Sequence, residues 1–139
     1  MSTHLVAWAV LQRPDGAVLL ARRSGVRYGS GLWGLPGGHV EDHESLAAAA
    51  ARELAEEVGV QVGADVLEPF GVTRYVDGDV RGCDFFYLAT AWTGVPAPVA
   101  ECSQVAWFAP DQVPPDALPW LAAALQGHLV ERRWVRDVR

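Results

Sequence analysis

A spaced pattern of glycine, glutamate and arginine between Gly38 and Val60 constrains this 139-residue chain more than any other feature. Five residues separate Gly38 from Glu44, seven more precede Arg52, and the continuous segment Arg52-Glu53-Leu54-Ala55-Glu56-Glu57-Val58-Gly59-Val60 follows. The second half predicts a helix over residues 45–58 that ends at Gly59, because glycine readily adopts the left-handed conformation after a helix. The pattern therefore predicts a loop that leads directly into this helix.

The predicted helix places Glu53, Glu56 and Glu57 on one face. At about 100° per residue, Glu56 lies ~60° to one side of Glu53 and Glu57 ~40° to the other. At ~6 Å and an effective dielectric constant of ~20, each pair of like charges costs roughly 3 kcal/mol. A cation among the carboxylates or protonation relieves that cost. Oxygen ligands without a nearby imidazole or thiolate favour Mg²⁺ or Mn²⁺ over zinc.

The helix also predicts how it is held in the fold. A stripe of small and aliphatic residues beside the acidic face should pack on a sheet, and it comprises Ala47, Ala50, Ala51, Leu54 and Val58. Residues 24–44 are too rich in glycine for a regular element, and a loop of this length inside a compact domain is usually functional. It ends in Gly37-Gly38, where the backbone can approach closely and carbonyl groups could reach a metal ion.

Turn residues bound the other predicted elements. Asp15-Gly16 between two apolar runs predicts a hairpin. The apolar runs predict strands at residues 4–12, 17–22, 66–75, 80–92 and 104–109. Residues 116–128 should be helical, with Pro119 in the first turn, where proline is tolerated. The tail, 131–139, either extends that helix or is loose. Together these elements predict an α/β/α arrangement around a mixed sheet.

Composition narrows the class of protein. The length fits one domain, 1–139, with a single core. A net charge of −6 argues against a general nucleic-acid binder. All eleven basic residues are arginine, which excludes a lysine nucleophile. No apolar run is long enough for a membrane span, no signal peptide is evident, and a cytoplasmic, bacterial protein is expected. Cys83 and Cys102 show no metal-binding spacing and are assigned no chemistry.

The Gly38–Val60 pattern matches every defined position of the Nudix box, so the chain resembles the Nudix hydrolases. The resemblance implies an α+β fold, the α/β/α Nudix sandwich, with the helix of the box as its catalytic element. It implies that Glu53, Glu56 and Glu57 bind Mg²⁺ or Mn²⁺ and that the carbonyl of Gly38 joins them. It gives Arg52 a structural role in orienting the glutamates. Glu44 and Gly59 would be structural positions of the box, and a carboxylate at Glu44 also suits a helix start.

The resemblance implies attack of water on phosphorus, with metal ions neutralising the charge of the leaving group. A carboxylate should deprotonate or orient that water. Glu53 is the first candidate. Glu101 is the second, because the segment from Glu101 to Phe108 and the following Pro114-Pro115 resemble the region after the box in MutT-type enzymes. The alternative for Glu101 is an ordinary solvated carboxylate.

Substrate-binding candidates lie in the loop and on the strands. Arg23, thirteen residues before Pro36, has the spacing of a phosphate-contacting arginine in the MutT-like nucleoside triphosphate pyrophosphohydrolases. Where the prototype places a base-reading asparagine after the Pro-Pro pair, this chain has Ala117, with Asp116 beside it. Aromatic residues that could stack on a base are Trp8, Trp33 and Phe86. The other candidate contacts are Arg27, Tyr28 and His39.

The expected function is metal-dependent hydrolysis of a nucleoside diphosphate linked to a group X, with nucleoside triphosphates as the first choice of substrate. One alternative is a nucleotide sugar or an ADP-ribose compound. Another is a non-catalytic Nudix-like nucleotide sensor, although such modules usually lose carboxylates of the box. The expected partner is a small nucleotide and not a nucleic acid polymer or a membrane, and the resemblance also admits a homodimer.

Overall fold

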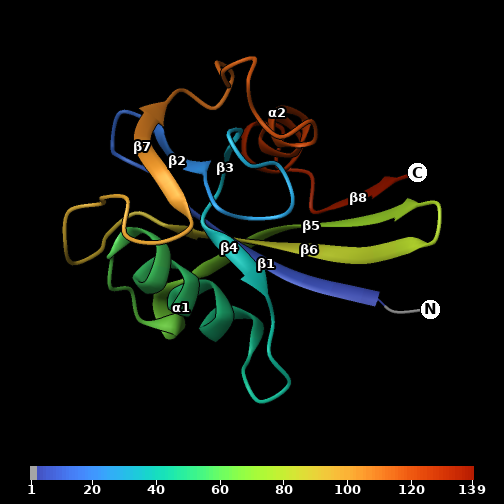
Figure 1. The fold of residues 1–139 in the computed structure, drawn as a ribbon, viewed down its shortest axis with the longest axis horizontal. Helices are drawn as coiled ribbons and strands as arrows, with labels where there is room; N and C mark the ends of the chain where they lie inside the picture. The colour runs from blue at the N-terminus through green and yellow to red at the C-terminus, as the bar shows by residue number, and fades with distance from the viewer. Residues whose placement is uncertain (1–2) are drawn as a thin grey trace.

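A computed structural model describes residues 3–139 and contains two β-sheets with helices on both sides (Figure 1). The larger, five-stranded sheet has the order β4-β1-β6-β5-β8 and mixes parallel and antiparallel pairs. Its strands are β1 (Thr3–Leu11), β4 (Gly37–His39), β5 (Glu68–Asp77), β6 (Val80–Ala89) and β8 (Val135–Val138). The smaller sheet, in the order β3-β2-β7, contains β2 (Val18–Arg23), β3 (Trp33–Gly34) and β7 (Cys102–Phe108).

The helix of the box, α1 (Leu46–Val58), covers one face of the larger sheet. The Ser45 hydroxyl caps it by accepting the N–H of Ala48 at 3.1 Å, and Gly59 ends it at φ 72°. This confirms the predicted helix. Its small residues bring it close to alanines of β1, and the shared core includes Ala7, Ala9, Ala49, Ala50, Leu54 and Val58.

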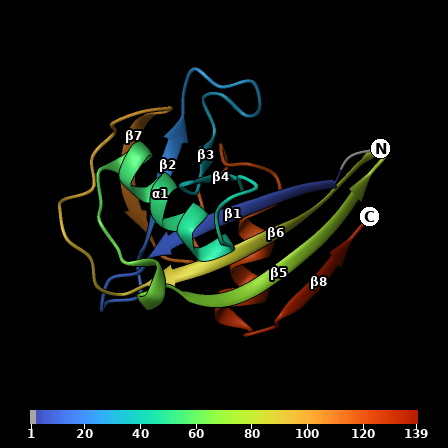
Figure 2. The same ribbon diagram turned by 90° about the horizontal axis from the view of Figure 1, so that it is seen from below.

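The opposite face of the larger sheet is covered by α2 (Leu121–Ala124), which continues as the π-helix η2 (Leu125–Val130) (Figure 2). A 3₁₀ turn, η1 (Ala64–Val66), follows α1. The second core lies between α2, η2 and the sheet and contains Val6, Trp8, Val10, Phe86, Leu121 and Leu125. Because helices cover both faces of the mixed sheet, the predicted α+β sandwich is confirmed.

The region after Pro115 differs from the prediction. A helix over residues 116–128 is wrong at its start, because the backbone of this segment pairs with β3. Trp33 donates its N–H to the carbonyl of Asp116 at 2.9 Å, and Leu118 donates to the carbonyl of Trp33 at 2.8 Å. These bonds hold residues 116–118 away from helical geometry, so α2 begins only at Leu121.

The C-terminal tail neither extends the helix nor stays loose. It forms β8, which pairs in parallel with β5 from Val72↔Val135 to Tyr75↔Val138. The N–H of Val72 donates to the carbonyl of Trp134 at 2.8 Å and begins this pairing. The sheet therefore gains an edge strand that the polar, arginine-rich sequence of the tail did not predict.

The predicted hairpin is only partly correct. Gly16 adopts a φ of 91° in the turn, but the strands on either side separate into different sheets. A single bridge, Gln12↔Val18, joins them. The glycine-rich loop also contains two short strands, β3 and β4, and the latter lies against β1. Among the described residues, no helix is long and apolar enough to cross a membrane.

Candidate active site

Two carboxyl groups of α1 meet the short strand β4 in the interior of the protein. Glu53 and Glu57 are 8% and 6% exposed and lie one helical turn apart. The N–H of Gly37 donates to Oε2 of Glu57 at 3.3 Å. Gly38 lies so close to Glu53 that a β-carbon there would be 2.5 Å from its Oε1. The two glycines of the loop thus form the wall against which the buried carboxyl groups rest.

Glu56, the third predicted carboxylate, lies on the same helix but is much less buried than this pair. Its side chain is 56% exposed and forms an ion pair with Arg52 at 3.2 Å. Across residues 3–139, no group of three or more His, Cys, Asp or Glu side chains is arranged to hold a metal ion. Glu56 lies at the solvent side of the cluster and is joined to Glu53 through the Arg52 guanidinium, which donates to both.

Arg52 is the cation that offsets the crowded carboxylates in this structure. Its guanidinium donates to Glu44 at 2.7 and 3.0 Å, to Glu53 at 2.9 Å and to Glu56 at 3.2 Å. It also donates to the carbonyl of His39 at 3.3 Å. The hydrogen bond from Arg52 lowers the pKa of Glu44 to about 2. Arg52 therefore joins the start of α1, its acidic face and the end of β4 into one unit.

Burial raises the pKa of Glu57 to about 10, and the hydrogen bond and negative charge of Glu53 add to this rise. The Glu57 carboxyl group therefore favours its protonated form near neutral pH when no cation balances the pair. Two buried carboxyl groups in contact, beside the Gly37-Gly38 backbone, form an oxygen-rich donor set of the kind that suits Mg²⁺ or Mn²⁺. A divalent cation would relieve the repulsion that protonation relieves here. Glu53, Glu57 and the Gly37-Gly38 backbone thus fit such an ion.

Glu101 lies beside the same pair. The N–H groups of Val99 and Ala100 donate to the carbonyl of Glu57 at 2.9 and 3.2 Å, which fixes the segment before β7 to the end of α1. Glu101 follows directly, is exposed and has a φ of 60°, which is uncommon for a residue other than glycine. Its charge contributes, after burial and Glu53, to the raised pKa of Glu57.

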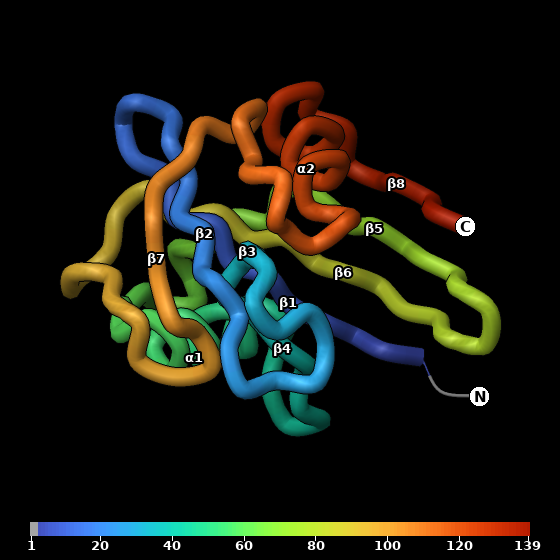
Figure 3. Tube along the Cα trace, turned by 45° about the horizontal axis from the view of Figure 1, so that its top comes forward, coloured from blue at the N-terminus to red at the C-terminus, as the bar shows by residue number. Residues whose placement is uncertain are grey.

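A cavity of about 900 Å³ opens beside the carboxyl pair, on the face of the larger sheet that α1 does not cover. Gly37, Gly38 and His39 form the edge next to α1. The floor consists of β1, β6 and β5, and Trp120 and the loop after β2 border the opening. In Figure 3 this loop runs between β4 and the chain that enters α2, and its Gly29 contacts Leu118. We refer to this space as the sheet cavity.

The sheet cavity contains two of the predicted substrate residues, Arg23 and His39, and the candidate Tyr28. Arg23 donates to the carbonyl of Tyr28 at 2.8 Å, and its guanidinium lies over the Tyr28 ring at 5.8 Å. His39 lies 3.1 Å from the ring of His4. Arg27 is exposed and does not line the cavity.

Trp33 and Phe86 were expected to stack on the substrate, and the structure corrects this. Both are core residues, 7% and 1% exposed, and neither lines the sheet cavity. Trp33 packs edge-on against Phe108, with the guanidinium of Arg22 over its ring. The pairing of β3 with β2 places the Trp33 ring against the smaller sheet. Phe86 lies on the same face of β6 as Asp84, but Phe70, Trp120 and His128 pack around its ring and cover it.

Other cavity residues escaped the sequence prediction. They come mainly from β5, β6, β8 and the start of α2, and include Thr73, Tyr75, Asp84, Trp120 and Arg136. Asp84 had a visible signal, because it is a charged residue inside the otherwise apolar run of β6. The other residues had no recognisable signal in the sequence, because they reach the cavity only through the pairing of β8 with β5 and the packing of α2.

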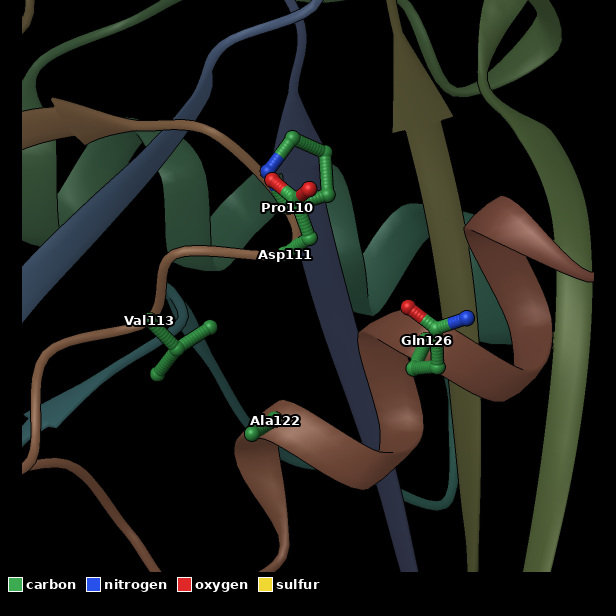
Figure 4. Close-up of a pocket in the computed structure, with 5 residues that line it drawn as sticks. All are labelled: Pro110, Asp111, Val113, Ala122 and Gln126. Atoms are coloured by element: carbon green, nitrogen blue, oxygen red, sulfur yellow. The ribbon is translucent and has the colours of Figure 1, made fainter.

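A second, smaller hollow of about 200 Å³ lies between the chain after β7 and α2–η2 (Figure 4). It is lined by Pro110, Asp111, Val113, Ala122 and Gln126. None of these residues belongs to the sheet cavity or to the carboxyl cluster, so this hollow is separate from the candidate site.

Comparison with known proteins places the chain among relatives of one kind. A family model described as the NUDIX domain matches residues 2–132. A MutT-like protein of Streptomyces ambofaciens is 34% identical over 111 residues, which cover 79% of this chain and 67% of that protein. A putative 8-oxo-dGTP diphosphatase 3 of Mycobacterium tuberculosis is 34% identical over 114 residues, covering 73% and 49%. A CTP pyrophosphohydrolase of Escherichia coli is 45% identical over 56 residues, covering 40% and 41%. The chain thus spans about half or less of the last two proteins.

Solved structures share the fold. A MutT NUDIX hydrolase from Burkholderia pseudomallei aligns with a TM-score of 0.80 and 28% identity, covering 93% of this chain and 99% of that one. The NUDIX domain of Shewanella oneidensis NrtR, complexed with ADP ribose, aligns with a TM-score of 0.75 and 26% identity, covering 95% and 89%.

Proposed function

This chain belongs to the Nudix family, and we propose that it is a metal-dependent pyrophosphohydrolase that converts (deoxy)nucleoside triphosphates to a monophosphate and pyrophosphate. The observation that carries the proposal is the buried Glu53–Glu57 pair, held against Gly37-Gly38 at the edge of the 900 Å³ sheet cavity. The relatives named as diphosphatases and a pyrophosphohydrolase of nucleotides support the same class of substrate.

The residues of the chain have distinct roles in the proposed reaction. Glu53, Glu57 and the Gly37-Gly38 backbone would hold Mg²⁺ or Mn²⁺, and Glu56 would join them if its exposed side chain rotates inward. Such an ion would supply positive charge to the phosphate oxygens and acidify a water molecule. Arg52 holds Glu53 in place through its ion pairs. Arg23, which also lines the cavity, offers a cation to the phosphate chain.

Water attacks phosphorus, the bond to the bridging oxygen breaks, and pyrophosphate leaves. A carboxylate must accept the proton of the water. Glu53 is our choice for this base because it is buried against Gly38, which lines the cavity. Glu101 is the alternative, since it is close enough to Glu57 for its charge to affect the pKa of that group.

The test is turnover by the purified protein with and without Mg²⁺ on nucleoside triphosphates, nucleoside diphosphates, nucleotide sugars, ADP-ribose and diadenosine polyphosphates. Phosphorus NMR distinguishes monophosphate plus pyrophosphate from diphosphate plus phosphate. We expect the first product pair, and turnover only with the metal. Preferred turnover of ADP-ribose or a nucleotide sugar would instead favour the alternative substrates, and tight binding without any turnover would favour the nucleotide sensor.

Matched variants identify the base. Loss of a catalytic base typically costs on the order of 10²–10⁴-fold in rate. We expect such a loss of kcat for Glu53→Gln, while Glu68→Gln, an exposed acid at the start of β5, serves as the control. If Glu101→Gln causes the larger loss and Glu53→Gln mainly weakens metal binding, Glu101 is the base.

A further inference from the structure

Asp84 is a buried carboxyl group in the sheet cavity, and the proposed hydrolysis does not use it. It lies in the middle of β6, is 8% exposed and is paired in register with Val6 of β1 and Thr73 of β5. Directly paired residues of neighbouring strands point to the same face of a sheet. Asp84 therefore projects from the floor of the cavity, which Val6 and Thr73 also line.

No ion pair involving Asp84 exists among residues 3–139. Burial raises its pKa to about 6, which the neighbouring Trp8 indole partly opposes. A buried carboxylate without a cation is costly, and polar groups of this kind are usually retained where they bind something. Asp84 stays largely ionised at pH 7.5 and is then an acceptor of hydrogen bonds only.

The indole N–H of Trp8 lies beside this acceptor. The indole Nε1 of Trp8 is buried and has no hydrogen-bond partner at good geometry within residues 3–139. Trp8 is 7% exposed and lines the same cavity, where its ring lies 5.0 Å from that of Trp120. The carboxylate and the indole N–H thus lie together in an aromatic pocket, close to one another but without a hydrogen bond of good geometry between them, so both can turn to a ligand. Such a pair is complementary to a ring edge that carries an N–H donor next to an acceptor.

The position of this pair fits a nucleoside whose phosphates face α1. His39 pairs with Val6, and Val6 pairs with Asp84, so two strand spacings, about 10 Å, separate the phosphate edge of the cavity from Asp84. A nucleoside bridges a span of this size. Asp116, the acid in the loop after β7, is unavailable because it forms an ion pair with Arg22 at 3.0 Å and does not line the cavity.

We propose that Asp84 reads the base of the substrate by accepting a hydrogen bond from an exocyclic amino group, while the Trp8 indole donates to the neighbouring ring nitrogen or carbonyl. This inference rests on the proposed function, because it assumes a nucleotide in the sheet cavity. Bases with an amino group, such as cytosine, adenine and guanine, satisfy Asp84. A carbonyl oxygen at the same position, as in uracil, faces the carboxylate and is repelled.

Matched nucleotide pairs test the proposal, namely CTP with UTP, ATP with ITP and GTP with ITP. The members of each pair differ at or next to one amino group and share sugar and phosphates. For whichever ring the enzyme accepts, we expect kcat/KM for the amino-bearing member to be higher by roughly tenfold to a hundredfold, the usual value of a hydrogen bond to a charged group. In Asp84→Asn, which can also donate to a carbonyl, the gap should fall below about threefold.

Control variants distinguish a reading role from a general effect. Asp79→Asn, an exposed acid in the turn between β5 and β6, should keep the wild-type ratio. Trp8→Phe replaces the indole by an aromatic ring without an N–H. It should reduce the difference in kcat/KM between the two nucleotides of a pair. Wild-type ratios near one in all three pairs, or an unchanged gap in Asp84→Asn, would overturn the role of Asp84 while leaving the hydrolase intact.

A metal-free measurement separates this inference from the reaction itself. Calorimetric binding of CMP, UMP, AMP, GMP and IMP in EDTA requires no turnover. We expect the amino-bearing monophosphates to bind more tightly to the wild type and to lose this preference in Asp84→Asn. If the preference appears but no triphosphate is hydrolysed, the proposed activity fails and base reading by Asp84 stands.

Discussion

Gly38 and Glu53 are in direct contact where β4 meets α1, since a β-carbon on Gly38 would lie 2.5 Å from Oε1 of Glu53. The atom in the way is the end of a flexible side chain, so the chain can accommodate a methyl group by moving the carboxylate. The neighbouring Gly37 differs, because a β-carbon there would collide with the backbone carbonyl of Ala7 and with Trp8. Substitution of Gly38 should therefore disturb mainly the carboxylate of Glu53, whereas substitution of Gly37 should disturb mainly the packing of the sheet.

We therefore predict that Gly38→Ala folds with nearly wild-type thermal stability but binds Mg²⁺ more weakly and loses about 10²-fold or more in kcat/KM, because a displaced carboxylate is a misplaced catalytic group. Gly37→Ala should instead lower stability by about 1–3 kcal/mol through overpacking. Thermal unfolding, metal titration and turnover of both variants check this. Equal effects of the two variants on stability would contradict it.

Metal binding should release a proton from Glu57. Its pKa is raised to about 10, chiefly by burial, and a metal ligand must be deprotonated. Below this value the apparent affinity for Mg²⁺ should rise with pH, by up to about tenfold per unit. Calorimetry at pH 7.5 in buffers of different ionisation enthalpy should detect about one proton released per ion bound. Glu57→Gln should abolish the release, and metal binding without proton exchange in the wild type would refute the assignment.

The Glu44–Arg52 ion pair should stabilise the fold in a defined range of pH. The hydrogen bond from Arg52 lowers the folded-state pKa of Glu44 to about 2, so its contribution is complete above the unfolded value near 4.5 and is lost as pH falls through 2. Because the Arg52 side chain is 26% exposed and solvent screens the pair, we expect about 1 kcal/mol at pH 6. Glu44→Gln should cost this much at pH 6 and almost nothing at pH 2. Chemical unfolding at several pH values measures it, and a difference that does not change with pH would disprove it.

His128 should make the C-terminal part of the fold sensitive to acid. Its Nδ1 lies 2.7 Å from the carbonyl of Arg133, which can only accept, so Nδ1 carries the proton and Nε2 accepts from the Thr73 hydroxyl at 2.7 Å. Burial lowers the pKa of His128, so the unfolded chain binds a proton more readily below pH ~6.5. Stability should therefore fall as pH decreases from about 6.5 toward 5.

Thermal unfolding across this range checks the prediction. His128→Gln should lose part of the stability at pH 7.5 and show a smaller decrease toward pH 5, whereas His43→Gln, at an exposed position, should behave like the wild type. A parallel pH dependence in His128→Gln and the wild type would show that another group is responsible.

Local signals explain why much of the fold was predictable. The helix of the box, its cap at Ser45 and its end at Gly59 follow from helical periodicity and from residues that suit helix ends. The strands near residues 3–11, 68–77 and 80–89 follow from apolar runs between turn residues, with small errors at their ends. The sandwich then follows because an amphipathic helix and a half-apolar sheet must cover each other.

Partners distant in sequence decided what could not be predicted. Residues 116–118 are not helical because their backbone bonds to Trp33 of β3. The tail forms β8 because it pairs with the edge of β5. Trp33 and Phe86 became core residues because the two sheets and α2 enclose them. Composition and periodicity describe local sequence and do not predict contacts between segments that are far apart in the chain.

The carboxylates, their helical spacing, the Nudix family and the arginine that lies among them can all be recognised in the amino-acid sequence, because each is encoded within one turn or one motif. The burial of Glu53 and Glu57, the exposure of Glu56 and the shared position of Asp84 and Trp8 in one cavity arise from the packing of the folded chain. Burial and electrostatics depend on every element packed around a side chain, and these elements come from the whole length of the chain.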